Sequence, residues 1–216
     1  MKVLSLDMAS QKTGYALYND SQLIDYGLWD LSQTKEKDWR KRIATMAQHI
    51  SDFCDEQHID MIVAEDVPPI TQNSQTVKVL SALQGMLISL GIAHKIEVKF
   101  VSVTTWKSKL NLQLDKSSEG RAMTKRAKVN YPKQYDKFHS WVKGWGKKIS
   151  VDYANHTFGL DLIYKSPSSK SNQDDIADAI NIGWSVMGEN VEPYNLEDFQ
   201  SIMEHLYYRD WEGGLS

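Results

Sequence analysis

The first thirty residues show the short apolar runs and two-residue alternation that are typical of strands. Residues 3–8 predict a short buried strand, and residues 13–18 and 22–31 predict two more. The last two are separated by Asn19-Asp20-Ser21, a segment of turn-forming residues that strongly favours a hairpin. Three successive strands with tight turns predict an antiparallel meander.

The hydrophobic spacing then changes to the helical period and alternates with further strands. In the order helix, strand, helix, strand, the predicted elements are residues 38–57, 59–65, 74–90 and 96–103. Gly91 is expected to end the second of these helices. A short helix over 104–110, a helix over 172–187 and an amphipathic segment over 196–208 follow. This order predicts one α/β domain with a mixed sheet, although residues 107–170 give no clear order of elements.

The composition excludes several protein classes. Of 216 residues, 41% are hydrophobic and 25% are charged, which is ordinary for a soluble globular chain. The single cysteine, Cys54, excludes a disulfide framework and a zinc site built on paired cysteines. The apolar start of the chain is too short for a signal peptide, and no uninterrupted apolar run approaches the roughly 20 residues of a membrane span. We therefore expect no membrane association.

The charges are segregated along the chain, although the net charge is only −3. Residues 107–148 carry 12 basic and 3 acidic side chains, whereas residues 186–216 carry 1 basic and 7 acidic ones. A basic block of this size favours a polyanionic partner such as nucleic acid. Five aromatic residues within the block could stack on bases, namely Tyr131, Tyr135, Phe138, Trp141 and Trp145. A solvated insertion whose aromatic side chains pack locally explains the same pattern equally well.

Several carboxylates stand where apolar residues are expected. Asp7 and Glu65 each lie at or near the end of an apolar strand, and a buried charge needs a partner, a proton or a metal. Asp175 and Asp178 are three residues apart and so share one face of a helix. Acids in a first helical turn also stabilise the helix dipole, which explains Asp174 and Asp175 but not Asp178.

Four converging carboxylates have a specific chemical use. Hard divalent cations such as Mg²⁺ prefer oxygen ligands, and two such ions about 4 Å apart activate a water and stabilise the leaving oxygen of a phosphodiester. Such a cluster in a chain with a cationic, aromatic block indicates a metal-dependent nuclease.

These motifs together resemble the RuvC-type Holliday-junction resolvases of the ribonuclease H-like superfamily. The resemblance rests on Leu6-Asp7, Thr13-Gly14-Tyr15, Val63-Ala64-Glu65 and Asp175-Ile176-Ala177-Asp178-Ala179. The segment Val103-Thr104-Thr105-Trp106-Lys107 is similar to the one in which the family places a lysine near the metals. The resemblance implies an α/β fold with a mixed five-stranded sheet, three strands antiparallel and then two parallel, flanked by helices. It also implies a nuclease domain over 1–187, with a basic insertion at about 107–170 and an acidic tail over 188–216.

The function that the resemblance implies is a crossover junction endodeoxyribonuclease of DNA recombination and repair. Such an enzyme binds four-way DNA junctions as a homodimer and makes paired nicks, using two Mg²⁺ ions per active site that Mn²⁺ can replace. Matched residue by residue, the catalytic and metal-binding acids are Asp7, Glu65, Asp175 and Asp178, with Lys107 as a further catalytic residue. The long segment before Asp175 is more similar to phage-encoded members, which implies the cytoplasm of a bacterium or of a phage-infected host cell.

Two surfaces are expected to make the intermolecular contacts. The residues expected to bind DNA are Lys107, Lys109, Arg121, Lys125, Arg126, Lys128 and Lys133. The helix over 74–90 is the expected dimer interface, through Val77, Leu80, Ser81, Gln84 and Ile88.

Other interpretations remain open from the sequence. An actin-like ATPase or sugar kinase also begins with a strand, an aspartate and a hairpin, but its second glycine-rich phosphate loop is missing from this sequence. A ribonuclease H that cuts RNA–DNA hybrids would keep the same acids, and an inactive DNA-binding module would not need them.

Asp66 is left out of the site because its side chain points opposite to that of Glu65 if the strand continues.

Overall fold

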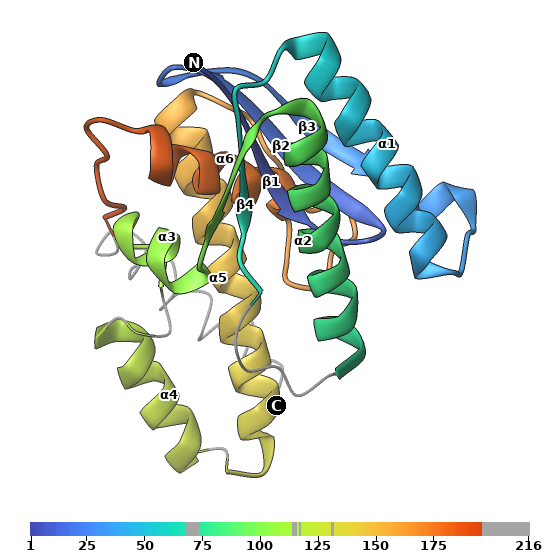
Figure 1. Ribbon diagram of the computed structural model, residues 1–216. Helices are drawn as coiled ribbons and strands as arrows, with labels where there is room; N and C mark the ends of the chain where they lie inside the picture. The colour runs from blue at the N-terminus through green and yellow to red at the C-terminus, as the bar shows by residue number, and fades with distance from the viewer. Residues whose placement is uncertain (68–73, 114–115, 117, 131, 196–216) are drawn as a thin grey trace. The chain divides into compact units, whose positions relative to one another are not determined.

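The computed structural model describes residues 1–67, 74–113, 116, 118–130 and 132–195 (Figure 1). The chain forms two compact units, one made of Met1–Trp106 and Asp175–Val191 and the other of Lys107–Asp174 and Glu192–Ser216. The amphipathic segment expected over 196–208 and the aromatic Tyr131 lie outside the described residues.

The first unit is built on a five-stranded sheet. Its strands are β1 (Lys2–Met8), β2 (Lys12–Asn19), β3 (Gln22–Asp30), β4 (Met61–Glu65) and β5 (Glu97–Val101). Their order across the sheet is β3-β2-β1-β4-β5, with antiparallel pairing among the first three and parallel pairing of β1 with β4 and of β4 with β5. The expected mixed sheet is therefore confirmed. So is the hairpin, in which Asp20 takes the left-handed backbone conformation (φ 52°) that Asp and Asn tolerate well.

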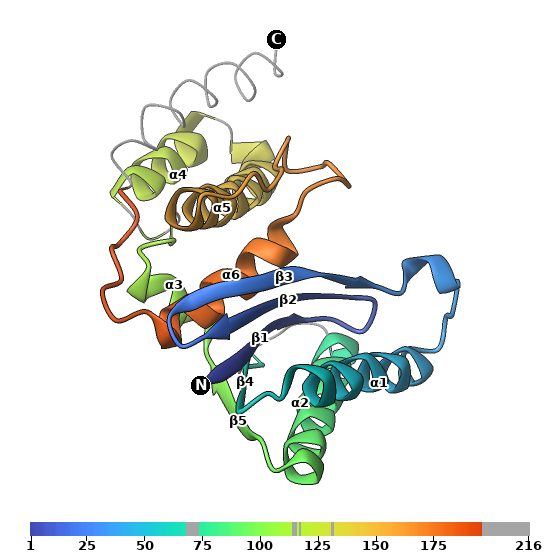
Figure 2. The ribbon, with the colours of Figure 1, turned by 90° about the horizontal axis from the view of Figure 1, so that it is seen from above.

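One face of the sheet carries the main apolar core, under α1 (Trp39–Gln57) and α2 (Ser74–His94), as Figure 2 shows. The core residues include Leu4, Leu6, Leu17, Met46, Ile50, Cys54, Ile62, Ala64 and Leu87. A short 3-10 helix, η1 (Ser32–Thr34), leads into α1, and Asp38 caps α1 by accepting a hydrogen bond from the Arg40 amide. Cys54 is therefore a buried core residue, and burial raises the pKa of its thiol to about 12.

Gly91 does not end the second helix, contrary to expectation, because α2 continues to His94. A Cβ at Gly91 would lie 2.4 Å from Val98 Cγ2 and 2.8 Å from the Ile96 carbonyl oxygen. The glycine is therefore needed for the close packing of α2 on β5, not as a helix stop. Among the described helices, α2 is also the one with the length and apolar composition of a membrane span, although no such span was expected. It packs on the sheet through Leu83 and Leu87, and 17% of its apolar window is buried.

The opposite face of the sheet is covered by α6 (Asp174–Met187), which makes specific polar contacts there. Ser5 Oγ donates to the Ala179 carbonyl and the Tyr18 hydroxyl donates to the Ile180 carbonyl, both at 2.7 Å. A Cβ at Gly183 would lie 2.5 Å from a Tyr18 ring carbon, so the helix backbone is very close to the sheet. These contacts fix the height and rotation of α6 over β1 and β2.

The second unit is helical. The helix α3 (Val103–Lys109) runs into it and is followed by α4 (Ser118–Asn130), the 3-10 turn η3 (Pro132–Gln134) and α5 (Tyr135–Phe158). The buried residues of α5 recur at helical spacing and include Phe138, Val142, Trp145 and Ile149. Phe138 and Trp145 are 0% and 5% exposed, so local packing, not base stacking, accounts for these two aromatic side chains.

Candidate active site

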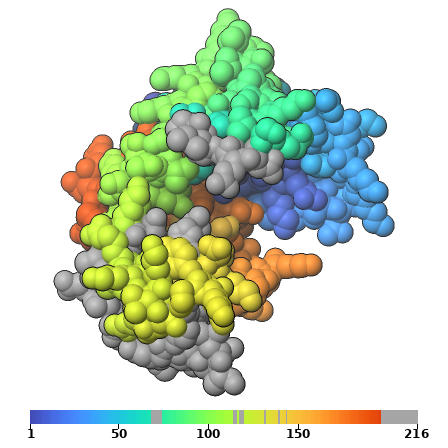
Figure 3. All heavy atoms as spheres, turned by 90° about the horizontal axis from the view of Figure 1, so that it is seen from below, coloured from blue at the N-terminus to red at the C-terminus, as the bar shows by residue number. Residues whose placement is uncertain are grey.

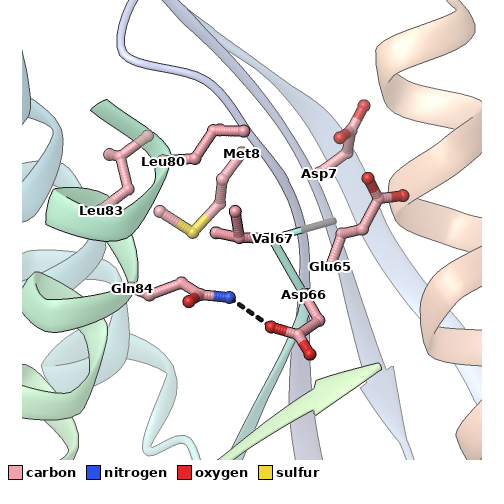
Figure 4. Close-up of a pocket in the computed structure, with 8 residues that line it drawn as sticks. All are labelled: Asp7, Met8, Glu65, Asp66, Val67, Leu80, Leu83 and Gln84. Carbon is pink, nitrogen blue, oxygen red and sulfur yellow. Dashed lines mark hydrogen bonds between the residues drawn. The ribbon is translucent and has the colours of Figure 1, made fainter. Parts of the chain in front are cut away.

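Asp7 is the last residue but one of β1, and Glu65 is the last residue of β4, its parallel neighbour. Leu6 of β1 pairs with Ala64 of β4, so the next residue of each strand is a carboxylate at the same level of the sheet. Side chains alternate along a strand, which puts Asp7 on the same face as Ser5, the face that α6 covers. Figure 4 shows the two carboxylates close together and turned the same way. The expected approach of these two acids is thus present in the structure.

The two acids lie at the edge of a small pocket. It is lined by Asp7, Met8, Glu65, Asp66, Val67, Leu80, Leu83 and Gln84. Apart from the polar groups of Asp7, Glu65, Asp66 and Gln84, its wall is apolar and comes from β1, α2 and Val67, the second residue after β4 (Figure 4). An apolar wall excludes water from one side of the carboxylates and so strengthens their electrostatic interactions.

Asp66 belongs to the pocket but not to the acid pair. Its carboxylate points away from that of Glu65 and accepts a hydrogen bond from Gln84 Nε2 at 2.8 Å (Figure 4). Its backbone N–H donates to the Val101 carbonyl at 2.9 Å, which continues the pairing of β4 with β5 by one residue. The expectation that Asp66 points opposite to Glu65 is therefore confirmed.

The start of α6 lies against β2 beside the acid pair. Gly14 is the antiparallel partner of Asp7, and a Cβ at Gly14 would lie only 2.0 Å from the Asp175 carbonyl oxygen. Asp178 is one turn further along α6, and both acids are half-buried. Gly14 is therefore required where the helix carrying two of the predicted site acids meets the strand next to Asp7.

The described geometry does not gather all four acids at one point. Among the residues that the structure describes, no three His, Cys, Asp or Glu side chains are close enough together to hold one metal ion. Two adjacent carboxylates nevertheless suit Mg²⁺, which proteins commonly bind through one or two carboxylates while water and substrate phosphates complete the octahedron. Asp7 and Glu65 thus fit the expected metal, while the four-acid ligand set stays a prediction.

Asp174, the neighbour of Asp175, is paired with a lysine of the second unit. It is buried, 8% exposed, and forms an ion pair with Lys147 of α5. Burial, with a smaller contribution from the Asp174 charge, raises the pKa of the nearby Tyr164 phenol to about 12. The carboxylate of Asp174 is therefore neutralised by a lysine, in addition to its expected contribution to the helix dipole.

Trp106 is a part of the site that the sequence did not reveal. Its side chain is 0% exposed, and its indole Nε1–H donates to Glu65 Oε2 at 3.1 Å. The sequence feature that could have pointed to Trp106 is its position directly before Lys107, in the segment that resembles the family's lysine segment. Lys107 itself is half-buried on α3 and is the first residue of the second unit.

The predicted DNA-binding residues lie mostly on solvent-exposed positions. The exposed ones are Lys109, Arg121, Lys125, Arg126, Lys128 and Lys133. Arg121, Lys125 and Lys128 follow helical spacing on one side of α4, while Met123 and Ala127 are buried. In Figure 3, α4 lies at the surface in yellow-green. The helix thus presents a basic surface, although its contact with DNA stays a prediction.

The comparisons with known proteins identify the fold. No protein-family model matches the sequence, and a search of curated proteins finds no match. The structure is similar to that of RuvC from Thermus thermophilus in complex with a Holliday junction substrate, with a TM-score of 0.57 and 10% identity over 87% of this chain and 97% of that one. A second RuvC structure from Thermus thermophilus matches with a TM-score of 0.52 and 12% identity, over 86% of this chain and 92% of that one. The RuvC-type, ribonuclease H-like fold that the motifs predict is therefore confirmed.

Proposed function

We propose that this protein is a metal-dependent endonuclease that resolves four-way DNA junctions, and related branched DNA, by paired nicks. The observation that carries the proposal is the pair Asp7 and Glu65, set side by side at the ends of two parallel strands in a RuvC-type sheet. The solved RuvC structure of the same fold is bound to a Holliday junction, which supports this substrate class.

The proposed chemistry assigns a role to each group. Asp7 and Glu65 hold divalent metal, with Asp175 and Asp178 contributing from α6. The bound metal supplies a water nucleophile at neutral pH and stabilises the leaving oxygen. Lys107 stabilises the negative charge that develops on the phosphate. The apolar wall of the pocket limits competing solvation of the acid pair.

A nicking assay tests the proposed activity. The protein is incubated in Mg²⁺ with an immobile four-way junction, a linear duplex of the same sequence and an RNA–DNA hybrid. We expect paired nicks in the junction and little cutting of the other two substrates. Preferential cutting of the hybrid would favour a ribonuclease H, and tight junction binding without any cutting would favour a binding module.

We further propose that the exposed basic residues of α4 bind the DNA backbone. Replacing Lys125, Arg126 and Lys128 with Ala should weaken junction binding and flatten its salt dependence, by about 0.9 in the log–log slope for each phosphate that is no longer neutralised. The matched control replaces three lysines of the first unit, Lys35, Lys37 and Lys41, and removes the same charge. An equal change in both triple variants would show that only net charge matters.

We also propose a homodimer, because two symmetric nicks need two active sites related by a two-fold axis. The outer side of α2 carries the exposed residues Ser81, Gly85, Ile88 and Ile92 at helical spacing, and the two isoleucines are 48% and 76% exposed. Leu80 and Gln84, which were expected in the interface, line the pocket of the acid pair instead. The proposed interface is therefore this outer stripe.

Light scattering tests the dimer. Ile92→Asp should convert a dimer into a monomer, whereas Ile24→Asp, at an exposed position on β3 (45% exposed), should leave the mass unchanged. A wild-type protein that is monomeric both alone and with junction DNA would contradict this part of the proposal.

A further inference from the structure

The hydrogen bond between Trp106 and Glu65 joins a fully buried donor to one oxygen of a proposed metal ligand. Indole nitrogen is a donor only, so the bond has one direction, from Nε1–H to Oε2, and its length is 3.1 Å. A ring that is 0% exposed is held by packing on all sides and cannot rotate freely. The direction in which Oε2 is engaged is therefore set by the fold.

The backbone around Trp106 explains how the donor reaches Glu65. Val101 of β5 pairs with Glu65 of β4, so the two strands end at the same level. Ser102 follows at once and starts α3: its hydroxyl accepts from the Thr105 amide at 3.1 Å and its carbonyl accepts from the Trp106 amide at 3.2 Å. A single residue thus separates the strand from the helix, and the first turn of the helix returns Trp106 to Glu65.

We propose that Trp106 is a positioning residue that makes Glu65 bind metal through one oxygen and thereby favours Mg²⁺ and Mn²⁺ over Ca²⁺. This inference rests on the proposed function, because it takes Glu65 as a metal ligand. With Oε2 held by the indole, a bound ion would be coordinated through Oε1. A carboxylate that could rotate would offer both oxygens to a single cation.

The selectivity follows from the coordination chemistry of the two kinds of ion. Mg²⁺ requires a near-ideal octahedron with short bonds, which suits carboxylates that each give one oxygen. Ca²⁺ accepts six to eight oxygens in flexible geometry and readily binds a carboxylate through both oxygens. Turning Oε2 towards the ion would strain its hydrogen bond to the fixed indole, so the restraint disfavours two-oxygen binding and costs Ca²⁺ more than Mg²⁺ or Mn²⁺.

Metal binding without DNA tests the inference independently of nicking. The affinities of Mn²⁺ and Ca²⁺ are measured by calorimetry on the whole protein, for the wild type and for Trp106→Phe, which removes the donor. Loss of a partner that orients a metal ligand commonly costs about 10–100-fold in metal affinity. We expect Mn²⁺ affinity to fall by about that factor and Ca²⁺ affinity to fall clearly less. The ratio of Mn²⁺ affinity to Ca²⁺ affinity should therefore drop.

A second variant and a control separate positioning from folding. Because Phe is smaller than a buried Trp, Trp106 is also replaced with 3-benzothienylalanine, which keeps the bicyclic shape and has sulfur in place of N–H. Trp29→Phe is the matched control, since Trp29 lies in the same unit and stacks on Tyr15 with ring centroids 4.6 Å apart. The isosteric variant should reproduce the drop in the ratio, and the control should not.

The outcomes are distinct. Equal losses for both ions in Trp106→Phe, or an unchanged ratio in the isosteric variant, overturn the positioning role while leaving the metal site intact. A wild-type protein that binds neither ion, alone or with junction DNA, refutes the metal site and with it the proposed function.

Discussion

The two faces of the central sheet are packed by different means. Against α1 and α2 the sheet presents apolar side chains such as Leu4, Leu6 and Ile62, which are held by burial alone. Against α6 it presents the hydroxyl donors Ser5 and Tyr18 and the glycine Gly14 beside apolar residues such as Val3 and Val63, and the backbones come very close together. Burial is non-directional, whereas a hydrogen bond to a particular carbonyl defines one position.

The difference indicates what each face contributes. The apolar face supplies most of the stability, because its contacts remove large side chains from water. The α6 face determines where the predicted site acids lie, because its contacts fix the helix that carries Asp175 and Asp178 next to the strand that carries Asp7. We therefore expect substitutions on the apolar face to lower stability with little loss of specific activity. Substitutions on the α6 face should lower specific activity by more than their loss of stability explains.

The largest effect is expected at the acid pair. Asp7→Asn keeps the size of the side chain and removes its charge, so the metal loses an anionic ligand worth several kcal/mol in the transition state. The nicking rate in Mg²⁺ should fall about a thousandfold, while junction binding in Ca²⁺ is kept. Asp66→Asn is the control on the same pocket, because its carboxylate faces the other way and bonds Gln84. If Asp66→Asn is equally inactive, the assignment of the two acids is wrong.

Substitutions on the apolar face should have the next largest effect. They should change the free energy of unfolding and not the nicking rate. Leu87→Ala deletes a fully buried side chain beneath the sheet and should lower the free energy of unfolding by about 2–5 kcal/mol. Urea denaturation measures the change, with Ile24→Ala at an exposed position of β3 expected within about 0.5 kcal/mol of wild type. The nicking rate per folded molecule should stay near that of the wild type, and a large drop would contradict the division between the faces.

A glycine contact sharpens the comparison on the α6 face. The added methyl of Gly14→Ala would overlap the Asp175 carbonyl, so the start of α6 must move away from the acid pair. Overpacking of this kind costs about 1–3 kcal/mol of stability, and we expect nicking to fall further than stability alone explains. Gly146→Ala on α5 is the control, since its Cβ meets nothing within 4 Å and should raise helix stability. A Gly14→Ala variant as active as the wild type would contradict the inference that the α6 face positions the predicted site acids.

The smallest effect is expected from a single hydroxyl. Ser5→Ala removes the buried bond to the Ala179 carbonyl and should cost about 1 kcal/mol in urea denaturation. Thr45→Ala removes an exposed hydroxyl that bonds within α1 and should cost clearly less. Equal costs for the two would show that burial adds nothing to the α6 contact.

The sequence predicted most of the first unit because its strands alternate clearly and its site acids interrupt apolar strands. Asp7 and Glu65 could be found because a charge at the end of a buried strand needs a reason. Trp106 could not be found, because its partner is distant in sequence and a buried Trp is ordinarily a core residue. Its hydrogen bond depends on where β5 ends and α3 begins, which only the folded chain determines.

The second unit was harder to predict for a different reason. The spacing of Phe138, Val142, Trp145 and Ile149 is that of a helix, but the interleaved lysines also fit a solvated segment. No helix was predicted here from the sequence, and the burial of these four residues in α5 shows that they form its packed side. The excess of basic residues in this unit can be counted from the sequence, whereas its helices could not be placed from the sequence.

The contact between Gly14 and the Asp175 carbonyl has an evolutionary consequence. A larger residue at position 14 can be accepted only if α6 shifts, and a shift of α6 displaces the acids it carries. A substitution in one of these two segments, which are distant in sequence, therefore affects the other. In related sequences we expect substitutions at Gly14 to occur together with changes at the beginning of α6.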